Sequence, residues 1–256
     1  MNWSNFIYFA FASLTLWIVG LILLYRIKSL SVGKIFIFAG ILLFSVFIAG
    51  LWIGQGHPPL RTIGETRLWY SLFIIIVGFF TYLHWEYKWL MGYSILVSAV
   101  FIFVNLLKPE IHTTNLMPAL RSIWFVPHVT VYILSYAMLG AATIAAFAAM
   151  RELRSNTRLI PLVDNLVYIG FGFLMMGMLM GAIWAKEAWG DYWSWDPKEV
   201  WAFITATAYL IYIHSRLRGY PLKYNLWLLP VAFILLMITW IGVNYLPAAQ
   251  GSIHIY

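Results

Sequence analysis

Residues 5–25 read NFIYFAFASLTLWIVGLILLY and contain no charged side chain, so they are long and apolar enough to form a transmembrane helix. Similar runs recur along the chain, which is 63% hydrophobic and 10% charged, with a mean hydropathy of +0.84. A soluble domain carries roughly 25% charged residues, so lipid must cover much of this surface. The sequence therefore predicts an all-α integral membrane protein.

The apolar runs predict about eight transmembrane helices, since only helices satisfy the backbone in lipid without closing a barrel, and barrel alternation is missing. The first run has no Lys or Arg before Arg26, so we expect a retained helix and not a cleaved signal peptide. Residues 1–256 are expected to form a single polytopic membrane domain. The predicted helices span residues 5–25, 33–54, 67–85, 89–107, 127–150, 165–185, 199–217 and 224–246.

Positive charges in the connections indicate the orientation. Alternate connections hold ten Lys and Arg residues on one side and six on the other, and the richer side is expected to be cytoplasmic. Both termini and the Trp-rich segment 184–203 would then lie on the outer face. The net charge of +7 is scattered and forms no basic stripe, so no nucleic-acid partner is predicted, and lipids are the expected surroundings.

The external segment 184–203 reads WAKEAWGDYWSWDPKEVWAF and combines five tryptophans with acidic and basic side chains. Part of it has a local explanation. Asp196 suits a helix N-cap, Pro197 the first helical position, and Glu199 the third, where its carboxylate can reach back to the cap. The segment thus predicts the start of the helix at 199–217.

The capping pattern leaves the crowding of tryptophans unexplained, and two interpretations stay open. The indoles form an ordinary belt at the membrane interface, or they form a platform if the segment coils as an interfacial helix. A platform beside Lys186 and Lys198 would suit a flat, apolar ligand with anionic tails. The indoles concerned are those of Trp184, Trp189, Trp193 and Trp195.

Histidines on the outer side include His128, which follows a proline at a helix start, and His254 in the C-terminal tail. Two imidazoles at this level either bind a metal axially or serve as caps and solvated side chains. His214 and His84 lie near inner helix ends, where a hydrogen bond or the headgroup region also explains them. Gly177 and Gly181 form a small-x-x-x-small pair that predicts close helix contact, for which ordinary bundle packing is a sufficient reason.

Three passages carry a resemblance to a known family: PALRSIWFVPHVTVYILSYA (118–137), GAIWAKEAWGDYWSWDPKEVWAFIT (181–205) and GVNYLPAAQGSIHIY (242–256). With YIHSR around His214, they resemble the CcsA family, also called ResC, of system II cytochrome c synthases. The Trp-Gly-x-x-Trp-x-Trp-Asp core resembles the WWD signature of haem-handling proteins. The likeness extends from about residue 118 to the end.

This resemblance implies a subunit that moves haem b (iron protoporphyrin IX) to the outer face for thioether attachment to Cys-x-x-Cys-His apocytochromes. It implies that His128 and His254 ligate the external haem iron and His214 an inner one, whose second ligand belongs to a CcsB/ResB-type partner. The insertion-like PAAQGS before His254 departs from the family pattern. The implied haem-binding residues also include Trp184, Trp189, Trp193, Trp195 and Asp196.

The resemblance further implies a bacterial inner (cytoplasmic) membrane, or a thylakoid membrane, with the working face periplasmic or lumenal. Enzymatic activity would then belong to the assembled haem–cytochrome c synthase, a lyase. The chain has no cysteine, so any thiols involved must come from the substrate. Two alternatives stay open: a haem exporter or chaperone of the CcmC type that forms no bonds, and a transporter with no haem role.

Overall fold

The computed structural model describes residues 1–26, 30–108, 122–152 and 159–247. Every regular element within these ranges is helical, which confirms the predicted all-α class. The chain divides into two compact units, Met1–Leu116 and Met117–Tyr256. The single membrane domain expected from the sequence stays a prediction.

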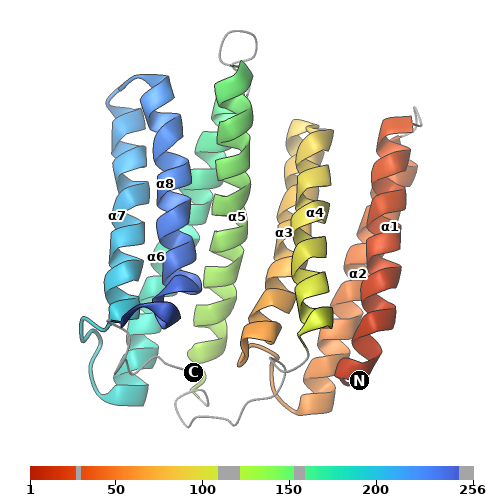
Figure 1. The fold of residues 1–256 in the computed structure, drawn as a ribbon, viewed down its shortest axis with the longest axis horizontal. Helices are drawn as coiled ribbons and strands as arrows, with labels where there is room; N and C mark the ends of the chain where they lie inside the picture. Colours follow the sequence, from red (N-terminus) through yellow and green to blue (C-terminus); the bar gives the residue numbers. More distant parts are fainter. Residues whose placement is uncertain (27–29, 109–121, 153–158, 248–256) are drawn as a thin grey trace. The chain divides into compact units, whose positions relative to one another are not determined.

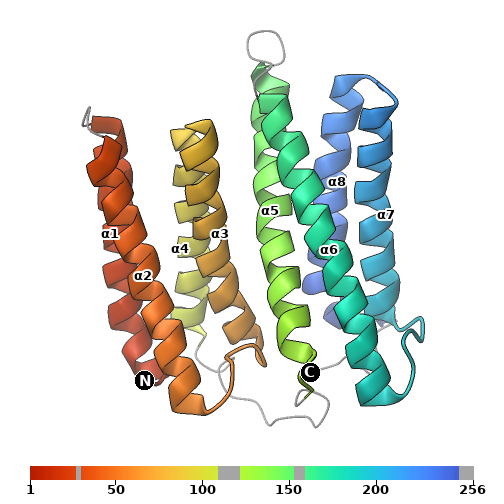
Figure 2. The same ribbon diagram turned by 180° about the vertical axis from the view of Figure 1, so that it is seen from behind.

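Each unit contains four long helices, and consecutive helices within a unit run antiparallel (Figures 1 and 2). The first unit contains η1 (Trp3–Asn5), α1 (Phe6–Arg26), α2 (Leu30–Gln55), α3 (Ile63–Trp85) and α4 (Lys88–Leu107). The second contains α5 (Phe125–Glu152), α6 (Leu159–Trp189), α7 (Pro197–Leu217), α8 (Leu222–Trp240) and η4 (Gly242–Tyr245).

Seven helices in the described part of the chain are long and apolar enough to cross a membrane, and α7 falls short on composition. Its 21 residues give a length of about 31 Å, close to the thickness of a bilayer core. Charged residues at its two ends, such as Glu199 and Arg216, lower its mean hydropathy. The eight expected helices are therefore present, and the charged ends of α7 make it the least apolar of them.

In the first unit, aromatic side chains from α1 and α2 form the core. Trp17 is fully buried, and its ring centroid lies 5.6 Å from that of Phe44. Gly40 allows this approach, since a Cβ there would lie 2.6 Å from the Trp17 ring. Such packing through small residues is how helices associate in lipid.

The start of α3 corrects the prediction, which placed it at residue 67. The helix begins at Ile63 because Thr62 and Glu65 form a capping box, with Glu65 N donating to Thr62 Oγ1 at 3.1 Å. The Glu65 carboxylate also accepts from the backbone N–H of Arg61 at 2.7 Å and from the Gln55 amide at 3.1 Å. One buried carboxylate therefore organises the connection between α2 and α3.

In the second unit, α5 packs closely on α6. A buried alanine face on α5 and Gly170 on α6 bring the helices together, and Ser135 Oγ donates to the Gly170 carbonyl at 2.7 Å. Helix α6 is longer than the predicted 165–185. It starts at Leu159 because Pro161 falls in its first turn, where a missing N–H costs nothing.

The described positive side chains of the richer set lie at one end of each unit, where helices α1 and α3 end and α2 and α4 begin, and where α5 and α7 end and α6 and α8 begin. They are Arg26, Lys34 and Lys88 in the first unit, and Arg151, Arg216, Arg218 and Lys223 in the second (Figure 1). In the first unit, Lys88 Nζ donates to the carbonyl of Leu24 at the C-terminal end of α1, at 2.6 Å. A cation at this end of a helix complements its dipole. For these described residues the predicted alternation is confirmed within each unit, and the cytoplasmic assignment stays a prediction.

Candidate functional site

Six of the eight predicted site residues lie at one end of the second unit. This end holds the first turn of α5, the last turns of α6, the 190–196 connection and η4 (Figures 1 and 2). His214 lies near the opposite end, on α7. His254 lies outside the described residues. The site residues placed at the first end are His128, Trp184, Trp189, Trp193, Trp195 and Asp196.

His128 lies in the first turn of α5, as predicted, and its ring packs against α6. Its Nδ1 atom lies 2.8 Å from the backbone oxygen of Gly177. A carbonyl oxygen only accepts hydrogen bonds, so Nδ1 must donate its proton to it. In the neutral imidazole this tautomer places the lone pair on Nε2, the atom that would ligate a metal.

Two glycines on α6 make room for the rings of His128 and its neighbour Tyr132. A Cβ on Gly181 would lie 2.6 Å from His128 Cε1, and one on Gly177 would lie 3.0 Å from the ring of Tyr132. The close helix contact predicted for the Gly177/Gly181 pair is confirmed. The glycines also let the imidazole reach a backbone carbonyl, which the sequence pattern did not indicate.

Trp184 is buried beneath His128, with 1% of its surface exposed. Its ring is stacked on the imidazole at a centroid distance of 5.5 Å and an interplanar angle of 29°. Trp189 and Phe125 contact the same indole at 4.8 and 5.2 Å. Trp184 therefore holds the His128 ring in place by stacking on it, and its burial gives it a packing role.

The interfacial helix on which the tryptophan platform was conditional does not form. Helix α6 ends at Trp189, and Gly190 follows in a left-handed conformation with φ of +97°. The chain from Gly190 to Asp196 is non-helical, so Trp189 and Trp193 do not share a helix face. Trp193 and Trp195 instead form an edge-to-face pair, with centroids 5.8 Å apart.

The capping pattern predicted at the start of α7 is confirmed. Asp196 accepts from the backbone N–H of Lys198 at 3.0 Å, Pro197 takes the first helical position, and Glu199 accepts from the N–H of Asp196 at 3.1 Å. Glu199 Oε2 also accepts from the N–H of Ser194 at 2.8 Å. Both carboxylates are buried, so Asp196 serves as a cap.

The two lysines of this end differ in their surroundings. Lys186 is exposed, donates to the backbone oxygen of Gly190, and lies 5.5 Å above the ring of Tyr192. Lys198 lies in the first turn of α7, outside the seven apolar spans. Burial lowers the pKa of Lys198 to about 8, and the nearby Asp196 carboxylate opposes the change. Lys198 is therefore a cation whose charge is lost at mildly alkaline pH.

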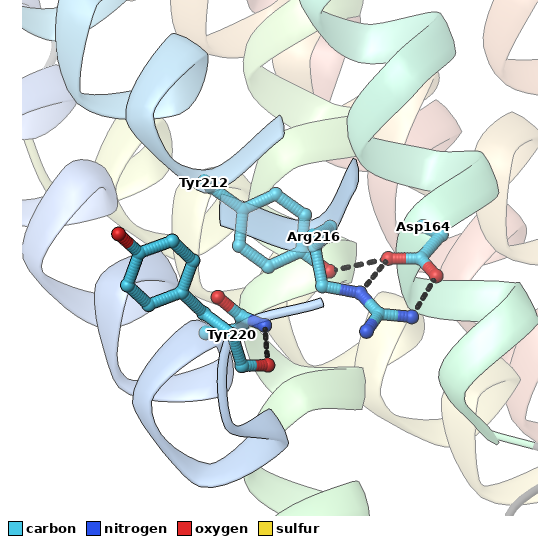
Figure 3. Close-up of polar contacts among 5 residues, drawn as sticks. Asp164, Tyr212, Arg216 and Tyr220 are labelled. Atoms are coloured by element: carbon cyan, nitrogen blue, oxygen red, sulfur yellow. Dashed lines mark hydrogen bonds and ion pairs between the residues drawn. The ribbon is translucent and has the colours of Figure 1, made fainter. Parts of the chain in front are cut away.

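A polar cluster near the other end of the unit was missed by the sequence reasoning. Asp164 on α6 accepts from Arg216 Nε at 2.9 Å and from its second terminal nitrogen at 2.7 Å, and the Tyr212 hydroxyl donates to it at 2.6 Å (Figure 3). Asn225 donates to the Tyr220 carbonyl beside this cluster. The acidic Asp164 inside an apolar run could have indicated this cluster. The predicted helix began at residue 165, one residue after it.

His214 lies in the same stretch of α7, between Tyr212 and Arg216, and its side chain is exposed. Its Nδ1 lies 2.9 Å from the carbonyl oxygen of Leu210, so the neutral ring again carries its lone pair on Nε2. His57 contacts the Pro58 carbonyl, His84 is exposed at the end of α3, and His112 lies outside the described residues.

Comparison with known proteins agrees with these features. The family model for cytochrome C assembly protein matches residues 7–249. The cytochrome c biogenesis protein CcsA of Chlamydomonas reinhardtii is 33% identical, over 87% of this chain and 68% of that protein. CcsA of Mesostigma viride is 31% identical, over 97% and 96%, and CcsA of one strain of Prochlorococcus marinus is 30% identical, over 84% and 82%.

These matches cover both units and include the end of α6 and the start of α7. Together with the apolar helices, they give the protein a membrane location and a role in cytochrome c maturation, which involves haem and a cytochrome partner. The chain belongs to the CcsA family of cytochrome c biogenesis proteins.

Proposed function

We propose that this chain is the haem-handling subunit of a system II cytochrome c synthase, and that it presents haem b at the outer membrane face. The observation that supports the proposal best is the setting of His128. A backbone carbonyl and the buried face of Trp184 fix its ring at the end of the unit that holds the Trp-rich connection.

The residues at this end fit haem. A histidine that ligates iron normally donates its other ring nitrogen to a carbonyl or carboxylate, as His128 does. A porphyrin also needs flat apolar surface and cations for its propionates. Tyr192 and Trp195 expose 59% and 65% of their surface here, and Lys198 supplies a positive charge.

We assign the second external ligand to His254, and an inner ligand role to His214. Bis-histidine ligation needs only two imidazoles, so it is compatible with the described ranges, which contain no group of three or more metal-ligating side chains. The side chain of His214 is exposed on α7, and we propose that its opposite ligand comes from outside this unit. A CcsB/ResB-type subunit is the proposed source.

Bound haem supplies two vinyl groups, and each thiol S–H of an apocytochrome Cys-x-x-Cys-His segment adds across one vinyl to form a thioether with no leaving group. The protein's own contribution is to orient the ring and exclude water. The chain has no cysteine that would compete for the vinyls. The proposed site faces the periplasm of a bacterium or the lumen of a thylakoid, and activity belongs to the assembled synthase.

Co-expression tests this proposal. The full chain would be produced with a CcsB/ResB-type partner and an apocytochrome, and the product would be assayed for covalently bound haem. We expect haem in the purified complex and thioether-linked cytochrome. Bound haem without any thioether product would instead indicate an exporter or chaperone, and a colourless complex would indicate a protein with no haem role.

A further inference from the structure

Trp195 has an unusual backbone. Its φ is +59°, a left-handed conformation that is rare for a bulky side chain. Within the described residues the other non-glycine case is Glu86, where the conformation has a local reason because Glu86 is the C-cap of α3. Trp195 lies before a helix, where no C-cap requires it. Strained backbone of this kind persists only when surrounding contacts hold it, and it is frequent at functional sites.

The contacts that hold Trp195 converge on one carboxylate. Glu199 Oε2 accepts from the backbone N–H of Ser194 at 2.8 Å and from that of Asp196 at 3.1 Å, the residues on either side of Trp195. The Ser194 hydroxyl lies 3.3 Å from the same oxygen. Turn backbone that includes a left-handed residue makes N–H groups converge on one anion. Glu199 therefore does more than close the capping box.

This backbone directs the Trp195 indole outward. The ring is 65% exposed, whereas Trp184 is 1% exposed. It lies edge-on to Trp193 at 5.8 Å and to Phe203 at 6.2 Å, and both contacts brace its orientation. An interface belt needs an indole at the right depth but no particular backbone conformation. A strained and braced orientation indicates a ring that must meet a defined surface.

We propose that Glu199 is a positioning residue that holds Trp195 in its left-handed conformation, so that the exposed indole covers a flat macrocycle bound at this end. The inference rests on the proposed haem-handling function and assigns the tryptophans different parts in it. Trp184 supports His128, and Trp195 contacts the ligand.

The test measures the affinity of the full chain, in its complex, for iron protoporphyrin IX by absorption titration. Trp195→Ala removes the indole and is expected to weaken binding about tenfold, the effect of losing one well-placed aromatic contact. Glu199→Ala is expected to weaken binding by a similar factor. The double variant is expected to bind no worse than Trp195→Ala alone, because both changes remove one contact.

Two controls separate positioning from general stability. Glu65 occupies the same capping-box position at the start of α3, so Glu65→Ala loses a comparable cap in the other unit and should bind within about twofold of wild type. Trp195→Gly should unfold at a higher temperature than Trp195→Ala, since glycine adopts this φ without strain. Equal unfolding temperatures for the two variants would show that the backbone of Trp195 is not strained, and the proposal depends on this strain.

The outcomes distinguish a failure of the positioning role of Glu199 from a failure of the proposed haem-handling function. If Glu199→Ala binds like Glu65→Ala, or if the effects of Glu199→Ala and Trp195→Ala multiply, the positioning role is wrong. If Trp195→Ala binds like wild type while His128→Ala does not, Trp195 belongs to an interface belt only. If the wild-type complex binds no haem, the proposed function fails, and this inference fails with it.

Discussion

Gly181 lies against the ring of His128, and a Cβ at this position would come within 2.6 Å of the ring carbon Cε1. The imidazole has little room to move away, because it is also stacked on the buried Trp184. Gly181 therefore controls whether His128 can keep its orientation.

Gly181→Ala is expected to displace His128 and to destabilise the protein by about 1–3 kcal/mol, the usual cost of overpacking. Thermal unfolding in detergent would measure the loss, and an absorption spectrum of added haem would show the displaced ligand. Gly172→Ala on the same helix is the matched control. A Cβ at Gly172 has nothing within 4 Å, so this variant should be neutral or slightly stabilising. Equal behaviour of the two variants would contradict the steric account.

His128→Ala and His254→Ala are each expected to shift or abolish the visible spectrum of bound haem, because each is proposed to remove one axial ligand. Added imidazole should restore the spectrum by filling the vacated position. His84→Ala, which removes an exposed imidazole at the end of α3, is the control and should leave the spectrum unchanged. Unchanged spectra in both proposed ligand variants would refute the pair.

Asp164→Ala is expected to cost about 2 kcal/mol or more, since it leaves Arg216 and Tyr212 without a shared acceptor in a half-buried setting. Asp164→Asn should cost less, because its amide oxygen still accepts from Tyr212 Oη. Thermal unfolding would rank the two variants, with Arg218→Gln at an exposed position of the same end as control. A reversed ranking would show that the acceptor retained for Tyr212 adds nothing to stability.

As the pH rises, the titration of Lys198 is expected to increase the free energy of unfolding and to decrease the affinity for haem. Burial lowers the pKa of Lys198 from 10.5 to about 8. The unfolded chain therefore binds more protons between about pH 8 and 10, and this residue makes the free energy of unfolding rise with pH in that window. Affinity for the anionic propionates of haem should fall by a few fold between about pH 7 and 9, where Lys198 of the folded protein loses its charge.

Lys198→Arg separates this effect from other titrations, because a guanidinium stays charged at these pH values. We expect the fall in haem affinity between pH 7 and 9 to be smaller in Lys198→Arg than in wild type. An identical fall in both proteins would exclude Lys198 as the source.

Local patterns were the part of the structure that the sequence could predict. The start of α7 follows from Asp196, Pro197 and Glu199 alone, because a capping box involves neighbours in the chain. The same pattern at Thr62 and Glu65 was overlooked, since charged residues there interrupt the apolar run, and the start of α3 was placed too late. Helix number and antiparallel order followed from hydropathy.

Contacts between helices were beyond prediction. The partner of His128 is 49 residues away, and its identity depends on the register of α5 against α6. The pairing of Asp164 with Arg216, 52 residues away, has the same origin. The roles of the tryptophans also depend on packing, because nothing in the amino-acid sequence of the segment distinguishes the buried Trp184 from the exposed Trp195.

The partner of His128 is part of the main chain, and this limits what evolution or protein engineering can change. No amino-acid exchange deletes a peptide oxygen, so the proton on this imidazole cannot be reassigned by mutating its acceptor. The tautomer is instead set by the packing of α5 on α6, which places Nδ1 against that oxygen. A designer who wishes to change the tautomer must therefore change how this helix pair packs.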